Sequence, residues 1–274
     1  MPAHPPSAAD VPDVRAQLIR RLTDALRAKP WALAAWLGGS DATGRTDRWS
    51  DIDLVLVVED NAVEPAFATA KATLEALAPI QLELRLPTPT WHGHDQAFWQ
   101  LADVPDWCMV DFVVIRRSST ASWFLEAERH GTPHVLFDPH ALAKPVPLDR
   151  ARHDAAVRGR LDALVPRFRL LQHLVRKAVW RGDAVEAIDR YVAFTLKPLV
   201  EIARIRYCPD RFDYGLRYLR DDLPRGLYED LAAISLPGDL DAVETFQRKA
   251  EALFERELAG LGASTAPAPS PASR

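Results

Sequence analysis

The sequence predicts an α+β protein with a mixed β-sheet flanked by helices, followed by a separate helical bundle. Before residue 148, short apolar runs of strand length alternate with segments whose apolar residues recur at helical spacing. After residue 148, only the helical spacing remains. We therefore expect a disordered N-terminus at 1–10, a sheet domain at 11–148, a helical domain at 149–261 and a disordered Pro/Ala/Ser-rich tail at 262–274.

The elements of the sheet domain follow from its apolar pattern. A helix is predicted at 11–28, where apolar side chains recur on one face and Pro30 follows. A second helix is predicted at 63–78. The Trp-rich segment 91–107 has two prolines nearby and is expected to form a loop. Strands are predicted at 31–37, 51–58, 80–86, 107–115 and 134–138.

The helical domain is expected to begin after a linker at 144–149. Its first helix should bend at Pro166, and its second should be distorted at Pro198, because proline lacks the N–H that a helix interior needs. The last helix should end at Gly260. The four helices are predicted at 151–180, 183–206, 226–234 and 239–258.

Composition and charge limit the classes of function. The 274 residues carry a formal net charge of -4 without long runs of like charge, which argues against nucleic acid as a partner. Two cysteines far apart offer no disulfide framework, which favours a cytoplasmic setting. The N-terminus does not resemble a signal peptide, and no apolar stretch is long enough to span a membrane. The oligomeric state stays open between a monomer and a homodimer.

Two aspartates stand at the start of an otherwise apolar strand, in DIDLVLVV at 51–58. Side chains two residues apart on a strand project from the same face, so Asp51 and Asp53 converge. Two carboxylates placed in this way repel each other and lose hydration, and a divalent cation offsets both effects. Mg²⁺ prefers carboxylate oxygens together with substrate phosphates, and two such ions can clamp a phosphoryl displacement.

A glycine-rich turn lies about ten residues before these aspartates. Gly38 and Gly39 let the backbone approach a bulky anion, because neither residue carries a Cβ. Ser40 follows where a helix can start, so its hydroxyl and the nearby N–H groups suit a phosphate. Arg48 lies on the connection back to the aspartates and is a further candidate for nucleotide binding. The stretch therefore joins a phosphate cradle to a metal-binding strand.

This combination of Gly39-Ser40 with Asp51-Ile52-Asp53 resembles the signature of the polymerase-β-type nucleotidyltransferases, and the helical second half is similar to that of their aminoglycoside and lincosamide-modifying members. The resemblance implies that the Gly-Ser turn holds the phosphates of ATP and that the two aspartates bind two Mg²⁺ ions. It also implies a third carboxylate on a later strand, and Asp111 matches it within the apolar run MVDFVVI. The turn departs from the family pattern by an extra acid, Asp41, which can weaken triphosphate binding.

Two candidates have strong alternatives. Glu83, on the strand at 80–86, competes with Asp111 as the third carboxylate and as the base that accepts a proton from the acceptor. Lys197 can reach a triphosphate, but a solvated helix face on which it pairs with Glu201 explains it equally well. His92 and His94 have a zinc-like spacing, but no matching cluster follows, so we reject a structural zinc site.

The acceptor is the least determined part of the function. The tryptophans of segment 91–107 either line an acceptor pocket or close the edge of the core. A cationic acceptor such as an aminoglycoside needs several acids in the cleft, and four acids are candidates: Glu83, Asp95, Asp103 and Glu201.

The sequence therefore predicts a Mg²⁺-dependent adenylyltransferase that moves AMP from ATP onto a hydroxyl of a small molecule, with antibiotics as one candidate class, and releases pyrophosphate. Two alternatives stay open. One is a nucleotidyltransferase–HEPN protein of toxin–antitoxin type that modifies a protein or tRNA, since Arg167 and His173 have the spacing of the HEPN motif. The other is a non-catalytic nucleotide-binding protein.

Overall fold

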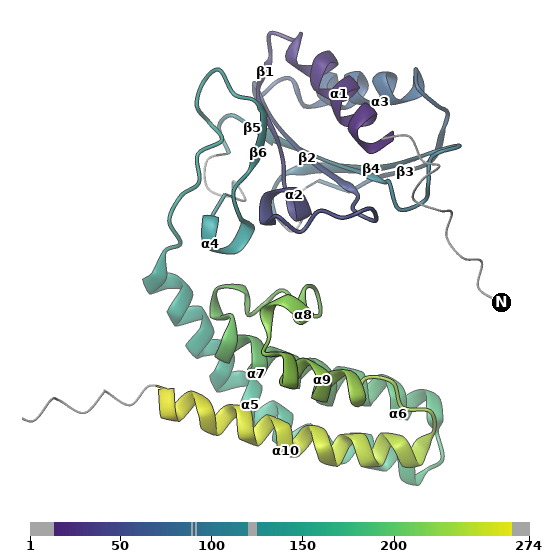
Figure 1. The fold of residues 1–274 in the computed structure, drawn as a ribbon, viewed down its shortest axis with the longest axis vertical. Coiled ribbons are helices and arrows are strands. Elements are labelled where there is room, and N and C mark those ends of the chain that lie inside the picture. The colour runs from purple at the N-terminus through teal and green to yellow at the C-terminus, as the bar shows by residue number, and fades with distance from the viewer. Residues whose placement is uncertain (1–13, 89, 91, 120–124, 265–274) are drawn as a thin grey trace, which may run out of the picture. The chain divides into compact units, whose positions relative to one another are not determined.

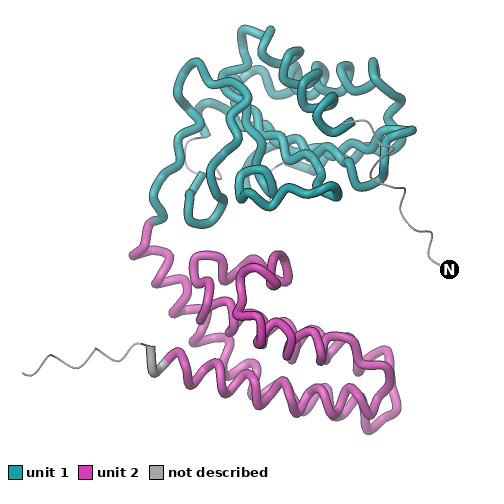
Figure 2. The backbone as a smooth tube through the Cα atoms, viewed as in Figure 1, with its two compact units in different colours: residues 1–148 teal, residues 149–274 magenta. Residues whose placement is uncertain are grey.

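The computed structural model describes residues 14–88, 90, 92–119 and 125–264. The chain divides into two compact units, residues 1–148 and residues 149–274 (Figure 2). The first unit contains a six-stranded mixed sheet with helices, and the second is helical (Figure 1). This architecture confirms the α+β class. Among the described residues, no helix combines the length and the apolar character that crossing a membrane requires.

The sheet has the strand order β3-β4-β5-β2-β1-β6. Strands β2 and β5 run parallel, and every other neighbouring pair is antiparallel. The strands are β1 (Ala32–Leu37), β2 (Ile52–Val58), β3 (Ile80–Arg85), β4 (Asp95–Leu101), β5 (Val110–Arg116) and β6 (His134–Phe137). The helices of this unit are α1 (Val14–Arg27), α2 (Gly39–Thr43), α3 (Val63–Glu75) and α4 (Ala127–His130).

Strand β4 corrects the expectation of a loop over 91–107. The stretch DQAFWQL alternates regularly, with Ala97, Trp99 and Leu101 buried against the core and the residues between them on the other face. The tryptophans and the flanking prolines are typical of a loop, and they mask this period of two in the sequence. The expected strand at 107–115 is correspondingly shorter at its start, since β5 begins at Val110.

The two faces of the sheet are covered differently. The larger core lies between the sheet and the helices α1 and α3, which cover one face (Figure 1). On the other face, a smaller core joins side chains of β1, β2 and β5 to Leu125 and Ala143. Strands β3 and β4 contribute no residue to this smaller core. We call the face that carries α1 and α3 the helix-covered face, and the opposite one the open face.

The second unit packs its helices around a core of its own. Its elements are α5 (Arg150–Trp180), α6 (Ala184–Tyr191), a π-helical turn η2 (Val192–Leu196), α7 (Lys197–Tyr207), a 3₁₀ turn η3 (Pro209–Arg211), α8 (Leu219–Asp222), α9 (Arg225–Ala233) and α10 (Leu240–Ser264). Pro166 lies inside α5.

The structure shows the surroundings of Pro198 and Gly260, the two residues at which the sequence predicted a distortion and a helix end. Pro198 is the second residue of α7, two residues after the end of the π-helical turn, and this distortion accommodates a residue that cannot donate a backbone hydrogen bond. Gly260 does not end α10, which continues to Ser264, so the predicted end is wrong. A Cβ at residue 260 would collide with the guanidinium of Arg206, so the glycine serves close packing between α10 and α7.

Candidate functional site

The parallel pairing of β2 with β5 sets Asp53 directly beside Asp111. Adjacent strands lie about 4.8 Å apart, and residues paired in register project from the same face. Asp53 alternates with the core residues Ile52 and Leu54 of the helix-covered face, so both carboxylates lie on the open face. Both residues are half-buried. The pairing therefore brings together two acids that are 58 positions apart in the sequence.

Burial gives Asp111 an unusual proton affinity. It raises the pKa of Asp111 to about 6, against a hydrogen bond from Gln96 that lowers it, and the charge of Asp51 adds a further upward shift. The pKa of Asp51 is also raised, chiefly by burial. Asp51 precedes β2, and its backbone carbonyl accepts a 3.0 Å hydrogen bond from Nε of Arg15. Negative charge on Asp51 and on Asp111 is therefore unfavourable without a cation.

The turn before α2 fits closely around Asp53. The N–H of Gly38 donates to the carbonyl of Asp53 at 2.8 Å. Gly39 has a φ of +49°, and a Cβ there would overlap Oδ2 of Asp53 and lie 2.6 Å from its Cγ. Only glycine satisfies both the backbone conformation and this contact. The glycine pair therefore keeps the carboxylate of Asp53 against the start of α2.

Ser40 presents a buried hydroxyl beside this turn. The residue is 7% exposed, and its Oγ has no hydrogen-bond partner among the residues that the structure describes. Buried hydroxyls in folded proteins are normally paired, so this atom indicates a ligand that accepts or donates a hydrogen bond here. A phosphate oxygen fits that requirement, since it can accept from Oγ close to the first N–H groups of α2.

Arg15 of α1 neutralises the extra acid in the turn. Its Nη2 forms an ion pair with Oδ2 of Asp41, and both side chains are largely buried. The same guanidinium donates to the backbone of Asp51, so one arginine ties α1 to α2 and to the start of β2. Sequence reasoning missed Arg15. The one available signal was the unmatched charge of Asp41.

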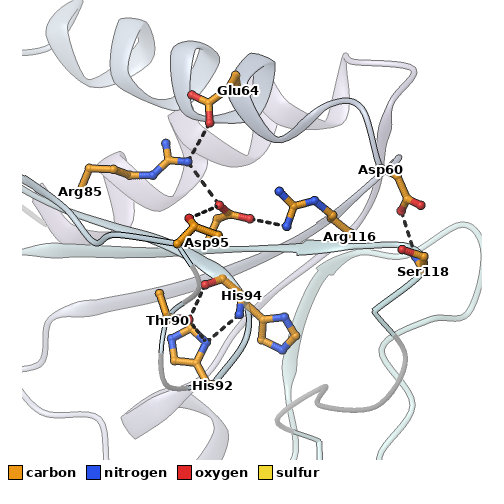
Figure 3. A network of polar contacts seen from close by, with 10 residues as sticks. Asp60, Glu64, Arg85, Thr90, His92, His94, Asp95, Arg116 and Ser118 are labelled. Carbon is orange, nitrogen blue, oxygen red and sulfur yellow. Dashed lines mark hydrogen bonds and ion pairs between the residues drawn. The ribbon is translucent and has the colours of Figure 1, made fainter.

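Gln96 of β4 holds Asp111 through an ordered chain of hydrogen bonds. Its Nε2 donates to Oδ1 of Asp111 at 2.7 Å, and its Oε1 lies 2.9 Å from Nε2 of His92. The backbone N–H of His94 donates to Nδ1 of His92 at 3.2 Å (Figure 3), so the proton of that ring belongs on Nε2. His92 then donates to Gln96, which fixes the orientation of the amide and turns its NH₂ group toward Asp111. Sequence reasoning missed this use of Gln96 and His92.

Glu83 is not brought to Asp111. It pairs across β3–β4 with Trp99, which in turn pairs with Val110, so Glu83 lies on the helix-covered face. Nζ of Lys71 binds it at 2.5 Å and Nε1 of Trp99 donates to it at 3.0 Å. These hydrogen bonds lower the pKa of Glu83. The sheet itself therefore separates Glu83 from the other carboxylates, and this position argues against Glu83 as the catalytic base.

The acids expected for a cationic acceptor do not converge in the sheet unit. Asp95 is buried on the helix-covered face, where Arg116 binds it at 2.6 Å and Arg85 at 3.6 Å (Figure 3). Asp103 occupies an exposed turn with a positive φ of 60°. Glu201 belongs to the second unit and is bound by Arg160 of α5.

The remaining candidates lie apart from the carboxylates or in the other unit. Arg48 is exposed and stacks over the ring of Trp49 at 4.4 Å, and Trp49 in turn meets Trp107 edge-on. Lys197 is exposed at the first position of α7 in the second unit, so its part in nucleotide binding stays a prediction. Trp99 is a core residue, whereas Trp91 lies outside the described residues.

The donor set suits a cation that brings other ligands with it. In the described part of the chain, no three His, Cys, Asp or Glu side chains gather closely enough to hold a metal ion by themselves. Mg²⁺ is usually held by one or two carboxylates plus substrate phosphates, and Asp53 with Asp111, next to the turn of Gly38 and Gly39, meets that description.

Comparison with known proteins supports the resemblance in the first unit. Residues 19–91 match the family model described as a nucleotidyltransferase domain; the match begins within α1, ends between β3 and β4, and does not reach Asp111. No curated protein shows a significant match to the chain.

Among solved structures, the chain is similar to an aminoglycoside 6-adenyltransferase from Bacillus subtilis, at 14% identity and a TM-score of 0.33, over 93% of each chain. It is also similar to a spectinomycin adenyltransferase from Enterococcus faecialis determined with ATP and spectinomycin. That similarity has 12% identity and a TM-score of 0.35, and it covers 89% of this chain and 99% of the other.

Proposed function

We propose that the nucleotidyltransferase domain transfers AMP from ATP to a hydroxyl of a small molecule and releases pyrophosphate. The observation that carries the proposal is the register that sets Asp53 beside Asp111, next to the turn of Gly39 and Ser40. Asp111 also accepts a hydrogen bond from the neutral amide of Gln96.

Each residue has a definite task in this reaction. Oγ of Ser40 and the backbone around Gly39 hold the β- and γ-phosphates, which leave as pyrophosphate. Asp51, Asp53 and Asp111 would hold two Mg²⁺ ions together with the phosphates, and Mg²⁺ bound there would supply positive charge to the reacting phosphate group. Arg15 keeps Asp41 neutralised, so that this acid does not repel the triphosphate.

Asp111 is the proposed base. The acceptor oxygen forms a bond to the α-phosphorus, the bond from that phosphorus to the bridging oxygen breaks, and the hydroxyl proton passes to Asp111. Burial raises the pKa of Asp111 to about 6 in the metal-free protein, and a bound cation would lower it from there, so the carboxylate is ionised and able to accept a hydrogen bond from the acceptor hydroxyl. Gln96 holds one oxygen of Asp111, which leaves the other for the acceptor or the cation.

The proposal is tested by measuring ATP binding by calorimetry with and without Mg²⁺, for the parent protein and for Asp53→Ala. We expect binding that depends on Mg²⁺ in the parent and is largely lost in the variant, with the same far-UV circular dichroism. Parent protein that binds no ATP in the presence of Mg²⁺ would show that the domain is not an active transferase.

A second measurement identifies the acceptor class. Protein, Mg²⁺ and α-labelled ATP are incubated with aminoglycosides, lincosamides, tRNA and cell-extract protein in separate reactions. Label on a small molecule supports the proposal, whereas label on macromolecules alone would favour the toxin–antitoxin alternative.

The role of Asp111 is tested by comparing the turnover of Asp111→Asn with that of Glu83→Gln. Glu83→Gln is the matched control, because both changes remove one carboxylate from the sheet but only Asp111 lies on the open face.

A further inference from the structure

A single row of paired residues crosses four strands of the sheet beside the carboxylates. Asp53 of β2 pairs with Asp111 of β5, Asp111 pairs with Phe98 of β4, and Phe98 pairs with Leu84 of β3. Because paired residues project from the same face, all four side chains lie on the open face. Leu82 lies on the same face, two residues before Leu84 along β3. We call Phe98, Leu84 and Leu82 the apolar row.

The alternation of β3 is inverted relative to that of a strand with one solvated face. Its charged residues, Glu83 and Arg85, point to the helix-covered face, where Lys71 and Glu64 of α3 bind them. Its leucines point to the open face, where Leu82 is 62% exposed and Leu84 is 56% exposed. Single exposed leucines are ordinary, but edge strands usually present charges to solvent. Two leucines beside Phe98 and the carboxylates therefore indicate an apolar ligand.

The position of α2 relates the apolar row to the two substrates of the proposed reaction. The turn with Gly39 and the hydroxyl of Ser40 follows β1, which is the neighbour of β2 on the side away from β5. The triphosphate therefore approaches Asp53 from that side. Asp111 lies on the other side of Asp53, and the next residue in the row is Phe98. An acceptor hydroxyl at Asp111 thus places the rest of the acceptor over the apolar row.

Charge narrows the class of acceptor. Two acids that a polycation would need, Glu83 and Asp95, lie on the helix-covered face and are bound by basic side chains there. On the open face, β4 offers the amides of Gln96, which is bound to Asp111, and of Gln100, which is bound to Asp106. Beyond the carboxylates of Asp53 and Asp111, which the proposed reaction uses, Phe98, Leu84 and Leu82 therefore offer apolar contact and no charge of their own.

We propose that the apolar row is the acceptor-binding surface, and that it selects a hydroxyl compound with an extended apolar face in preference to a polycationic one. This inference rests on the proposed function, because it places the acceptor of that reaction. It does not depend on a particular natural substrate. Partial burial of one leucine contributes about tenfold to affinity, so a change at Leu84 should have an effect of that size.

The test uses the full chain with methyl-labelled leucine, Mg²⁺ and a non-hydrolysable ATP analogue. Clindamycin serves as a hydroxyl compound with an apolar face, and kanamycin serves as a polycation. We expect clindamycin, and not kanamycin, to shift the methyl resonances of Leu82 and Leu84 in a saturable way. Leu84→Asn should weaken clindamycin binding about tenfold and leave the affinity for Mg·ATP unchanged.

The matched control is Val135→Asn, since Val135 is a 46% exposed apolar residue on β6, the opposite edge strand of the same sheet. It should leave clindamycin binding unchanged. Methyl resonances that stay silent with both compounds while Mg·ATP binds would overturn the apolar row and leave the proposed function intact. Shifts that follow protein concentration alone would assign the row to a second copy of the chain. Absence of Mg·ATP binding would instead reject the proposed function.

Discussion

Gly39 and Asp53 approach so closely that residue 39 has no room for a side chain, because a Cβ there would overlap Oδ2 of Asp53. Gly39→Ala should therefore displace the carboxylate and abolish the Mg²⁺-dependent binding of ATP, as measured by calorimetry. Gly44→Ala is the control. Residue 44 also has a positive φ, of +69°, but a Cβ there meets nothing within 4 Å.

Both Gly39→Ala and Gly44→Ala should lose about 1 kcal/mol of stability from backbone strain. Equal loss of ATP binding in both would show that strain, and not the contact with Asp53, is responsible.

Asp111→Asn should stabilise the protein in the absence of metal while it disables the reaction. The pKa of Asp111 is raised from 3.8 to about 6, so the folded state holds this proton more tightly than the unfolded state does. The stabilising effect of the proton is complete below about pH 4 and is lost as the pH rises through about 6. At pH 8 the ionised carboxylate therefore costs on the order of 2–3 kcal/mol, which the neutral amide of asparagine avoids.

Urea unfolding with EDTA at pH 8 and at pH 4 measures this difference. The variant should be more stable than the parent at pH 8 and nearly equal to it at pH 4. Turnover should fall by about two orders of magnitude or more, while the affinity for ATP changes little. A variant that is no more stable than the parent at pH 8 would contradict the burial of a charged Asp111.

Gln96→Leu should weaken the binding of a divalent cation at Asp111. The change removes the donor that fixes one oxygen of Asp111 and leaves Nε2 of His92 without its acceptor. Loss of such a supporting hydrogen bond lowers metal affinity by about 10- to 100-fold. The affinity is measured by electron paramagnetic resonance of Mn²⁺ in the presence of ATP.

Gln100→Leu is the matched control for this measurement. Gln100 lies on the same face of the same strand, but its amide binds Asp106 and not Asp111. It should therefore leave Mn²⁺ affinity unchanged, and His92→Ala should weaken it in the same direction as Gln96→Leu. If Gln96→Leu and Gln100→Leu behave alike, Gln96 does not position Asp111.

Local sequence patterns predicted most helices and strands of the first unit. Apolar periodicity located α1, α3 and most strands, since burying one face imposes a period that the sequence must carry. It failed for β4, where tryptophans masked a regular alternation, and at Gly260, where a glycine that looks like a helix end instead makes room for Arg206.

The sequence by itself determined the Gly-Gly-Ser turn, the spacing to Asp51 and Asp53, and hence the family to which residues 19–91 are matched. These features are local, because a tight turn and two side chains on one strand depend only on neighbouring residues. The choice between Asp111 and Glu83 was different. Both acids lie on strands, and alternation within each strand does not say which face either one shares with Asp53.

Only the tertiary structure decided that choice, because strand order and register are set by packing between distant segments. The parallel β2–β5 pairing puts Asp111 beside Asp53, while the β3–β4 register turns Glu83 to the helix-covered face. The ion pair of Arg15 with Asp41 and the hydrogen bond from Gln96 to Asp111 are likewise long-range contacts. Charges and amides that meet in space leave no periodic signal in the chain, since each partner alone looks like an ordinary surface residue.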